Sequence, residues 1–356
     1  MGEKPGEFGP ERWDRVLRRI QVTGGSTYIV SLPKEWVRRS NLSRGDYVEL
    51  VLELDGSLRI RPAERRAEKP ETSMTVSKDE PPEWVLREFI SRYLAGYYTI
   101  RVFFEDNVAP YRRLFRVVIP DKLIGVEVVD ESTKHLVAQC LVNVHELPLS
   151  TAIQRAYRIV HTMIYDALKV ISGELGAEML DDIVERDDLV DKFYLYSVRQ
   201  LNELLAGLIS PSEIGLARLS DSLTYRIMVK NLERIGDHAR RVAKSLKMLK
   251  KPVLEPNLGR VIVRLGEESL KLLEDAYKSF REGNTELAHR VIDAVNQRLP
   301  QLEGQALSFI LDRNYTSRQI TLLKTVVESL KRVAEYSADI AELAIDMSVH
   351  GGSGVG

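Results

Sequence analysis

The amino-acid sequence predicts a mainly α protein: two tandem three-helix bundles, preceded by a small β domain and a small α+β connecting segment. Three observations carry this prediction. From Thr151 to the C-terminus, apolar residues recur almost without interruption at the 3.6-residue period of a helix. One stretch of that helical region recurs later in it. Residues 12–62, in contrast, show short alternating runs separated by turns that contain glycine, which are typical of strands.

Residues 12–62 predict the β domain. Tyr28–Leu32 and Tyr47–Leu54 alternate as strands, and a short helix begins at Pro33 between them. The pair Asp55-Gly56 predicts a hairpin with the strand that follows it. A domain of about 50 residues buries little apolar surface by itself. We therefore expect a homodimer with intertwined strands.

The same residues carry a local excess of basic side chains, ten against six acidic ones. Such an excess can supply contacts to phosphates, which dominate the affinity of proteins for DNA. The residues leave a second interpretation open, in which the arginines are solvated charge on a module that only dimerises.

The segments TYIVSLPKEWVRR (27–39) and LSRGDYVELVLELDGSLRIRP (42–62) resemble the AbrB/SpoVT family of swapped-hairpin DNA-binding domains. The match covers roughly residues 15–61. It implies that two chains interleave into one fold, and that basic residues of the first strands and of the helix face DNA. At those positions this sequence has Arg18, Arg19, Arg38 and Arg39.

Residues 63–83 are densely charged and contain three prolines, which predicts a linker. Residues 84–149 predict a small α+β segment, because a helix at Trp84–Leu94 is followed by runs rich in β-formers. These runs are Tyr98–Phe104, Phe115–Ile119, Gly125–Val129 and His135–Val144.

Six helices are expected after residue 150, with Pro211, Pro252 and Pro256 at breaks between them. They are Thr151–Ser172, Glu178–Ile209, Pro211–Leu249, Arg260–Glu282, Asn284–Leu311 and Thr316–Val349. The segment NLERIGDHARRVA (231–243) recurs loosely as SLKRVAEYSADIA (329–341). This repeat predicts one three-helix bundle over residues 150–252 and a second over residues 253–349.

Composition limits the function. The chain has 356 residues, and 51 basic residues against 52 acidic ones leave a formal charge of −1, so any nucleic-acid interface must be a local patch. A single cysteine excludes a disulfide framework and a cysteine-based zinc site. No segment has the apolar length of a signal peptide core or a transmembrane helix. We therefore expect a cytoplasmic protein without membrane insertion.

Two pairs of carboxylates in the helical region predict a cation site. Glu233 and Asp237 lie four residues apart on one helix, and Asp187 and Asp191 repeat this arrangement on an earlier helix. Like charges at this spacing repel by a few tenths of a kcal/mol, so they need a compensating cation. Two pairs on facing helices would offer the oxygen ligands that iron, manganese and hard cations accept.

Gly236 lies between the second pair, in mid-helix, and predicts a close approach of another helix. A solvated face is the alternative to a metal site. In that case Asp237 pairs with Arg241, and Asp191 pairs with a neighbouring lysine.

The segment NLERIGDHARRVA closely resembles the signature helix of PhoU, the regulator of phosphate uptake, and DIVERDDLVD (182–191) resembles the preceding PhoU helix. The resemblance covers about residues 151–347. It implies two repeated three-helix bundles whose acidic pairs bind iron, manganese or zinc. It also implies phosphate control, exerted on a phosphate transporter ATPase or a signalling protein.

The second half departs from this pattern. Lys331 stands where Glu233 stands in the first copy, Glu335 replaces Asp237, and Val295 and Leu299 fall opposite the two aspartates. We therefore expect metal only in the first bundle.

No GxxxxGK[ST], GxSxG or HExxH motif is present in the sequence, and we expect a regulator rather than an enzyme. Two other interpretations stay open. One is a metal-carboxylate enzyme in the first bundle, and the other is a metal-binding helical adaptor that uses its N-terminal domain only to dimerise.

Overall fold

The computed structural model describes residues 16–52, 56–63, 70–249 and 254–351. The chain divides into two compact units, Met1–Glu68 and Lys69–Gly356, and each is described by itself. The predictions for residues 12–15, for Asp55, for residues 64–69 of the linker and for Pro252 lie outside the described residues. The fold is mainly helical, as the sequence predicts.

The N-terminal unit contains two separate hairpins and one short helix. Strands β1 (Gln21–Thr23) and β2 (Thr27–Ile29) pair antiparallel across Gly24 and Gly25, which both have positive φ. Helix α1 (Lys34–Arg39) follows Pro33. Strand β3 (Val48–Leu52) pairs with β4 (Leu58–Pro62). None of the described side chains of this unit is buried.

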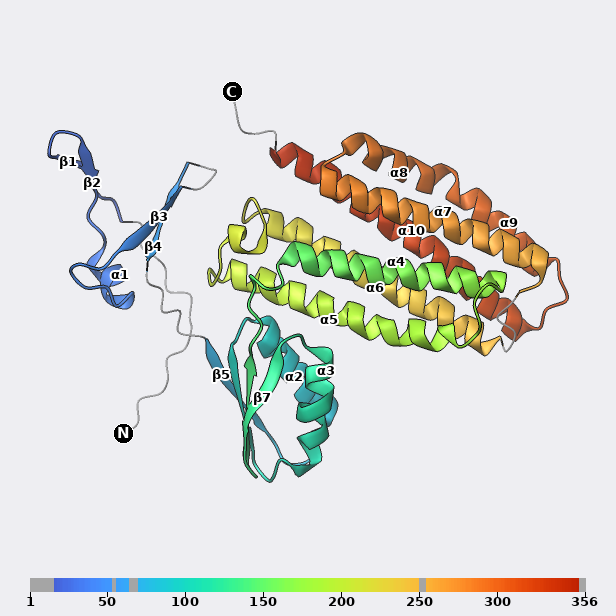
Figure 1. Cartoon of the computed structure of the whole chain (residues 1–356), viewed down its shortest axis with the longest axis horizontal. Helices are drawn as coiled ribbons and strands as arrows, with labels where there is room; N and C mark the ends of the chain where they lie inside the picture. The colour runs from blue at the N-terminus through green and yellow to red at the C-terminus, as the bar shows by residue number, and fades with distance from the viewer. Residues whose placement is uncertain (1–15, 53–55, 64–69, 250–253, 352–356) are drawn as a thin grey trace. The chain divides into compact units, whose positions relative to one another are not determined.

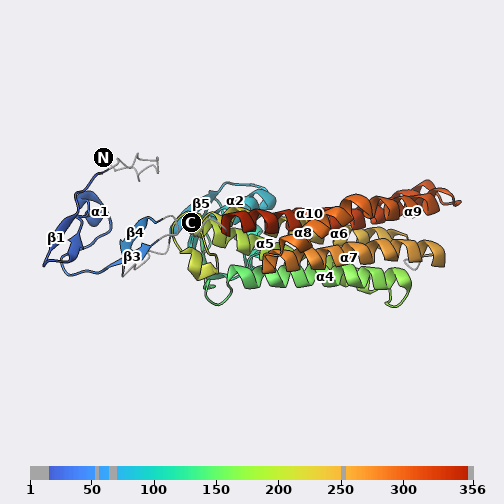
Figure 2. The ribbon, with the colours of Figure 1, turned by 90° about the horizontal axis from the view of Figure 1, so that it is seen from above.

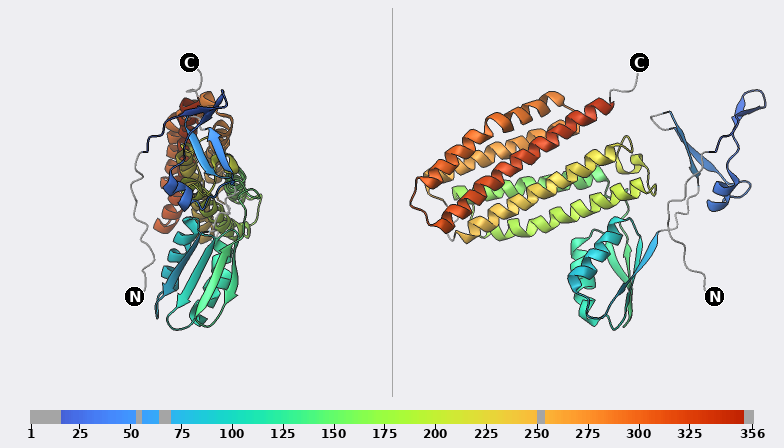
Figure 3. Two further views of the ribbon diagram at one scale, coloured as in Figure 1. Left: turned by 90° about the vertical axis from the view of Figure 1, so that its left-hand side faces the viewer. Right: turned by 180° about the vertical axis from the view of Figure 1, so that it is seen from behind.

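The α+β domain (residues 70–142) opens the second unit. Its four-stranded sheet has the order β5-β6-β8-β7, formed by Glu71–Val76, Thr99–Phe104, His135–Cys140 and Val126–Glu131. Helix α2 (Pro82–Leu94) joins the parallel pair β5 and β6, whereas the other pairs are antiparallel. The helices lie on one side of this sheet (Figure 3).

Two predictions in this region are wrong. Strand β5 lies inside the range 63–83 that we predicted as a linker, and its Met74 and Val76 point into the core between exposed polar neighbours. Residues 115–119 were predicted as a β-rich run, but Leu114–Val118 form a π-helical turn that continues into helix α3 (Ile119–Lys122). Leu114, Phe115 and Ile119 are buried together. A strand would direct the neighbours Leu114 and Phe115 to opposite faces, whereas a helical turn lets both contact the core.

Seven helices of the described chain form the two bundles (Figure 1). The first bundle consists of α4 (Leu149–Ser172), α5 (Met179–Leu205) and α6 (Asp221–Met248). The second consists of α7 (Pro256–Glu282), α8 (Thr285–Gln297), α9 (Leu299–Leu311) and α10 (Ser317–Gly351). Two expected helices differ from these. The helix predicted from Asn284 is divided at Arg298, ahead of Pro300, and Pro211–Ile214 form a separate 3-10 turn before α6.

The two bundles share one core. A single contiguous cluster of buried apolar side chains draws on every helix from α4 to α10. Helix α4 packs on α7, and α6 packs on α10, as the view in Figure 2 also shows. At the first of these contacts, a Cβ atom on Gly266 would lie 2.2 Å from Cδ2 of Leu168, so only glycine permits this approach. No helix of the described residues is long and apolar enough to cross a membrane.

Candidate metal centre and nucleic-acid interface

The structure brings the four predicted carboxylates together where α5 packs on α6. Asp187 and Asp191 come from α5, and Glu233 and Asp237 come from α6; we call these four residues the acid cluster. Gly236 makes this approach possible, because a Cβ atom there would already lie 3.3 Å from Oδ1 of Asp187. The predicted close approach at Gly236 is therefore confirmed.

Two basic side chains of α6 contact the acid cluster. Arg240 bridges the two helices, with Nε 2.9 Å from Oδ2 of Asp187 and Nη2 2.9 Å from Oδ1 of Asp237. Nζ of Lys230 lies 2.6 Å from Oε2 of Glu233. The alternative to a metal site named Arg241 as the partner of Asp237, and the structure places Arg240 there instead.

Burial and mutual repulsion act on the two aspartates of α5. The pKa of Asp187 is raised to about 7, first by burial and then by the charges of Asp191 and Asp237, although Arg240 opposes this shift. Burial also raises the pKa of Asp191, and the charges of Glu233 and Asp237 add to the effect. Burial and the neighbouring negative charges thus favour the protonated form of Asp187 and Asp191.

The oxygens of the acid cluster are of the kind that a hard cation accepts, but two of them already have cationic partners on Arg240. Oε2 of Glu233 is buried and accepts no well-aligned hydrogen bond, despite the nearby ammonium of Lys230. As they stand, no three acidic, histidine or cysteine side chains of the described residues converge as metal ligands. A metal would therefore have to take the place of Arg240 between the carboxylates.

The second bundle has its own internal cation at the corresponding place. Nζ of Lys331 lies 2.9 Å from Oε2 of Glu303 on α9 and 3.7 Å from Oε1 of Glu335. Val295 and Leu299, which align with the two aspartates of the first copy, are buried apolar side chains. Glu303 was not predicted, because its contact with Lys331 depends on how α9 packs on α10.

The four arginines predicted to contact DNA lie on two different elements. Arg18 and Arg19 are exposed in the segment ahead of β1. Arg38 and Arg39 lie at the end of α1, where both donate to the carboxylate of Glu35, at 2.8 Å and 3.1 Å. These two arginines lower the pKa of Glu35. The carboxylate of Glu35 thus offsets part of the positive charge that Arg38 and Arg39 give to α1.

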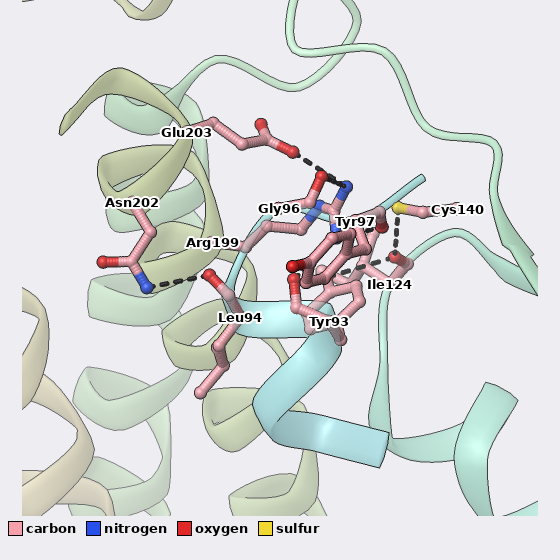
Figure 4. Close-up of polar contacts among 9 residues, drawn as sticks. All are labelled: Tyr93, Leu94, Gly96, Tyr97, Ile124, Cys140, Arg199, Asn202 and Glu203. Carbon is pink, nitrogen blue, oxygen red and sulfur yellow. Dashed lines mark hydrogen bonds and ion pairs between the residues drawn. The ribbon is translucent and has the colours of Figure 1, made fainter. Parts of the chain in front are cut away.

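A polar contact that the sequence did not predict joins α5 to the α+β domain (Figure 4). The guanidinium of Arg199 is buried and donates to the carbonyl oxygens of Tyr93, Gly96 and Tyr97 at the end of α2. It also pairs with Glu203 at 2.8 Å. We call this set the Arg199 latch. It gives a donor to the carbonyl oxygens of Gly96 and Tyr97, and a second donor to that of Tyr93, which already accepts from the backbone N–H of Gly96.

Two helical bundles that share one core, the first of which carries the acid cluster, define the class of protein as a tandem helical-bundle protein. The family model described as PhoU domain matches residues 153–246 and 262–344, which are these two bundles. The helical part of the chain therefore belongs to the PhoU family. A second model, described as antidote-toxin recognition MazE, bacterial antitoxin, matches residues 21–68, so a MazE/AbrB-like domain precedes it.

Two curated relatives are similar to this chain. A "Phosphate-specific transport system accessory protein PhoU homolog" from Clostridium acetobutylicum is 22% identical over 201 residues, which cover 55% of this chain and 89% of the relative. A second such homolog, from Thermotoga maritima, is 21% identical over 200 residues, with 55% and 84% covered. Among solved structures, PhoU from Pseudomonas aeruginosa has a TM-score of 0.49 at 21% identity, with 57% of this chain and 96% of that chain covered.

Proposed function

We propose that this chain regulates phosphate uptake or phosphate signalling, and that it binds DNA as a homodimer through its N-terminal unit. The observation that carries the proposal is the presence, in one chain, of two PhoU domains and a MazE/AbrB-like domain. The similar relatives bear the name of accessory proteins of a phosphate-specific transport system. We infer that the partner of the helical part is the ATPase of such a transporter or a signalling protein.

The homodimer is supported by the surface of the N-terminal unit. Leu17, Tyr28, Tyr47 and Leu52 are each more than three-quarters exposed, in a unit without a buried described side chain. Exposed apolar area of this size costs stability unless another surface covers it. A second copy of the same unit, interleaved as in the swapped-hairpin family, would cover these side chains and give the unit a core.

DNA binding is tested by measuring the affinity of the full chain for duplex DNA at several salt concentrations. We expect affinity that falls with salt, because released counterions drive binding to phosphates. The double variant Arg18→Gln/Arg19→Gln should flatten the salt dependence by about one unit of log–log slope per lost phosphate contact. The matched control is Arg155→Gln/Arg158→Gln on α4. If no duplex binds in a salt-dependent way, the DNA-binding proposal fails.

One observation favours a second candidate function, a metal-binding helical adaptor that dimerises without binding DNA. Glu35 pairs with both Arg38 and Arg39, so α1 presents less positive charge than its sequence suggests. The variant Glu35→Gln separates the two candidates. A DNA reader should gain affinity for DNA when this carboxylate is neutralised, whereas the adaptor should bind no DNA with either side chain.

We propose further that the acid cluster binds iron, manganese or zinc in the first bundle only. Support comes from the buried Oε2 of Glu233 without an aligned donor, and from the raised pKa of Asp187. Elemental analysis of purified protein tests this proposal. Asp187→Ala/Glu233→Ala should lose the metal, and Glu303→Ala/Glu335→Ala in the second bundle should retain it. Equal metal contents in the wild type and in Asp187→Ala/Glu233→Ala would refute the proposed metal site.

A further inference from the structure

The two outer strands of the α+β sheet differ in how well they are protected against pairing with a further strand. The order β5-β6-β8-β7 makes β5 and β7 the outer strands. Strand β7 has a register shift between Val128 and Asp130 and also carries the acidic residues Glu127 and Glu131, features by which proteins protect exposed strands. Strand β5 (Figure 1) pairs in regular register over six residues, with Glu71 as its one charged residue and no proline. The outer edge of β5 is therefore suited to accept another strand.

The backbone groups on the outer edge of β5 follow from its pairing with β6. The carbonyl oxygen of Val76 accepts from the N–H of Glu105, so the backbone groups of every second residue back from Val76 point to β6. Those of Glu71, Ser73 and Thr75 therefore point outward. Within the described residues, no strand pairs with this edge, and the side chains of all three residues are exposed. The edge thus offers a row of backbone donors and acceptors to an incoming strand.

A side chain of α2 reaches this edge without closing it. Nε of Arg92 donates to the carbonyl oxygen of Ser73 at 3.3 Å, and Nη1 of Arg92 lies 2.5 Å from Oε2 of Glu88. The carboxylate of Glu88 offsets the charge of Arg92, and a carbonyl oxygen has two acceptor positions, of which Arg92 takes one. The oxygen of Ser73 can therefore still accept from a second strand.

The position of β5 in the chain brings it near its own copy in the proposed homodimer. Residues 63–70 separate β4 of the N-terminal unit from β5. Even fully extended, a segment of this length spans only about 26–29 Å. Two paired N-terminal units, roughly 100 residues together, have a radius of gyration of about 13 Å. Two β5 strands tethered in this way meet at an effective concentration on the order of 1 mM, so a contact too small to join free chains can form.

We propose that the β5 strands of two copies pair antiparallel along their outer edges and join the two sheets into one. The inference rests on the proposed homodimer. Ser73 pairs with Ser73 of the second copy at the twofold axis, and Glu71 pairs with Thr75, so no like charges face each other. Neither family model covers the α+β domain, and the pairing gives this domain a role: it fixes the orientation of the two helical parts in the dimer.

The first test is thiol crosslinking of the full chain. In the proposed pair, the two Cα atoms of residue 73 lie about 5.5 Å apart, within the range that a disulfide bridges. On mild oxidation, Ser73→Cys should form a covalent dimer at least about tenfold faster than Glu127→Cys, the matched control on the outer strand β7. The native Cys140 is buried and does not compete. Crosslinking of Ser73→Cys that is no faster than that of the control would overturn the proposal.

The second test distinguishes strand pairing from mere proximity. Adding Thr75→Pro to Ser73→Cys should slow the crosslinking at least about fivefold, because proline removes an N–H that points outward. The same N–H is not used in the ladder with β6, so the sheet within each copy stays intact. Thr75→Val keeps the N–H and is the matched control, which should crosslink as fast as Ser73→Cys alone. Equal rates with proline and valine would refute the pairing.

Hydrogen exchange separates a failure of this inference from a failure of the homodimer. The amides of Ser73 and Thr75 should exchange at least about tenfold more slowly in the wild type than in Leu52→Asp, which places a charge on the exposed apolar surface of the N-terminal unit. The amides of β7 should exchange alike in both proteins. A dimeric wild type with unprotected amides at Ser73 and Thr75 refutes the β5 pairing, while the homodimer stands. A monomeric wild type refutes both.

Discussion

Asp187 is only 3% exposed, and its pKa is raised to about 7 from an ordinary value of 3.8. Between these two pH values, the folded metal-free chain holds a proton on this carboxyl that the unfolded chain releases. Because the folded state binds more protons in this window, the free energy of unfolding falls as the pH rises through it. Above pH 7 Asp187 is ionised in the folded chain as well, and its buried charge lowers the free energy of unfolding by a constant amount.

At the residue scale, we predict that Asp187→Asn stabilises the metal-free chain at pH 8. The gain should be about 1–3 kcal/mol, because the amide removes a buried charge, and it should shrink towards pH 4, where the native carboxyl is protonated. Urea unfolding with a chelator present measures both values. Glu185→Gln, an exposed neighbour on α5, is the control and should change the free energy of unfolding by less than about 0.5 kcal/mol. A gain that is the same at both pH values would contradict this account.

A second prediction at this scale concerns Arg199. Arg199→Ala would remove a donor from three carbonyl oxygens and leave Glu203 without its cation, at a cost of about 3–5 kcal/mol. Adding Glu203→Gln should recover part of the loss, because burial already raises the pKa of Glu203. The measurement is chemical denaturation of the full chain.

Arg116→Ala is the matched control for Arg199→Ala. Arg116 pairs with Glu131 in the same domain, but its side chain is 58% exposed, so we expect a loss below about 1 kcal/mol. Similar losses for the two arginines would show that the Arg199 latch is no stronger than a surface pair.

At the scale of elements, the contact between α4 and α7 depends on Gly266. Gly266→Ala would place a methyl group on Leu168, so we predict a loss of about 1–3 kcal/mol despite the better helix propensity of alanine. Gly304→Ala on α9 is the matched control. Nothing lies within 4 Å of the new Cβ there, so it should stabilise the chain by about 0.5–1 kcal/mol. Thermal unfolding compares the two, and a stabilising Gly266→Ala would refute the close packing.

The sequence predicted best those elements in which a periodic pattern of apolar residues extends over many residues. Helices α4, α5 and α10 repeat their apolar residues over many turns, and their bounds lie close to those expected. Strand β5 was missed because it has only six residues, next to a charged stretch. Val117 and Val118 favour strands, so the sequence predicts a strand at residues 115–119. Tertiary packing outweighs this preference, and the segment forms a helical turn.

The same distinction applies to the charged groups. Asp187, Asp191, Glu233 and Asp237 could be grouped from their spacing, because each pair shares a helix face. Arg199 and Glu303 could not, since their partners depend on how distant segments pack. The carbonyl oxygens that Arg199 caps lie about a hundred residues earlier in the chain.

At the scale of the whole molecule, the N-terminal unit determines the predicted oligomeric state. Leu52→Asp on β3 would place a charge on a surface that we expect a second copy to cover. We predict that this variant shifts the full chain from dimer to monomer in analytical ultracentrifugation, while its helical circular dichroism stays unchanged. Leu311→Asp, on the exposed end of α9, is the control and should remain dimeric. A dimer that survives Leu52→Asp would place the interface elsewhere.

The common core of the two bundles has a consequence for how the duplicated domain behaves. Each repeat has its own helices, but the buried side chains of α4 and α6 are completed by those of α7 and α10. A repeat taken alone would expose the apolar face that its twin now covers, and it would lose the cooperativity of the pair. The duplication has thus produced one folding unit, in which a substitution that loosens either bundle lowers the melting temperature of both.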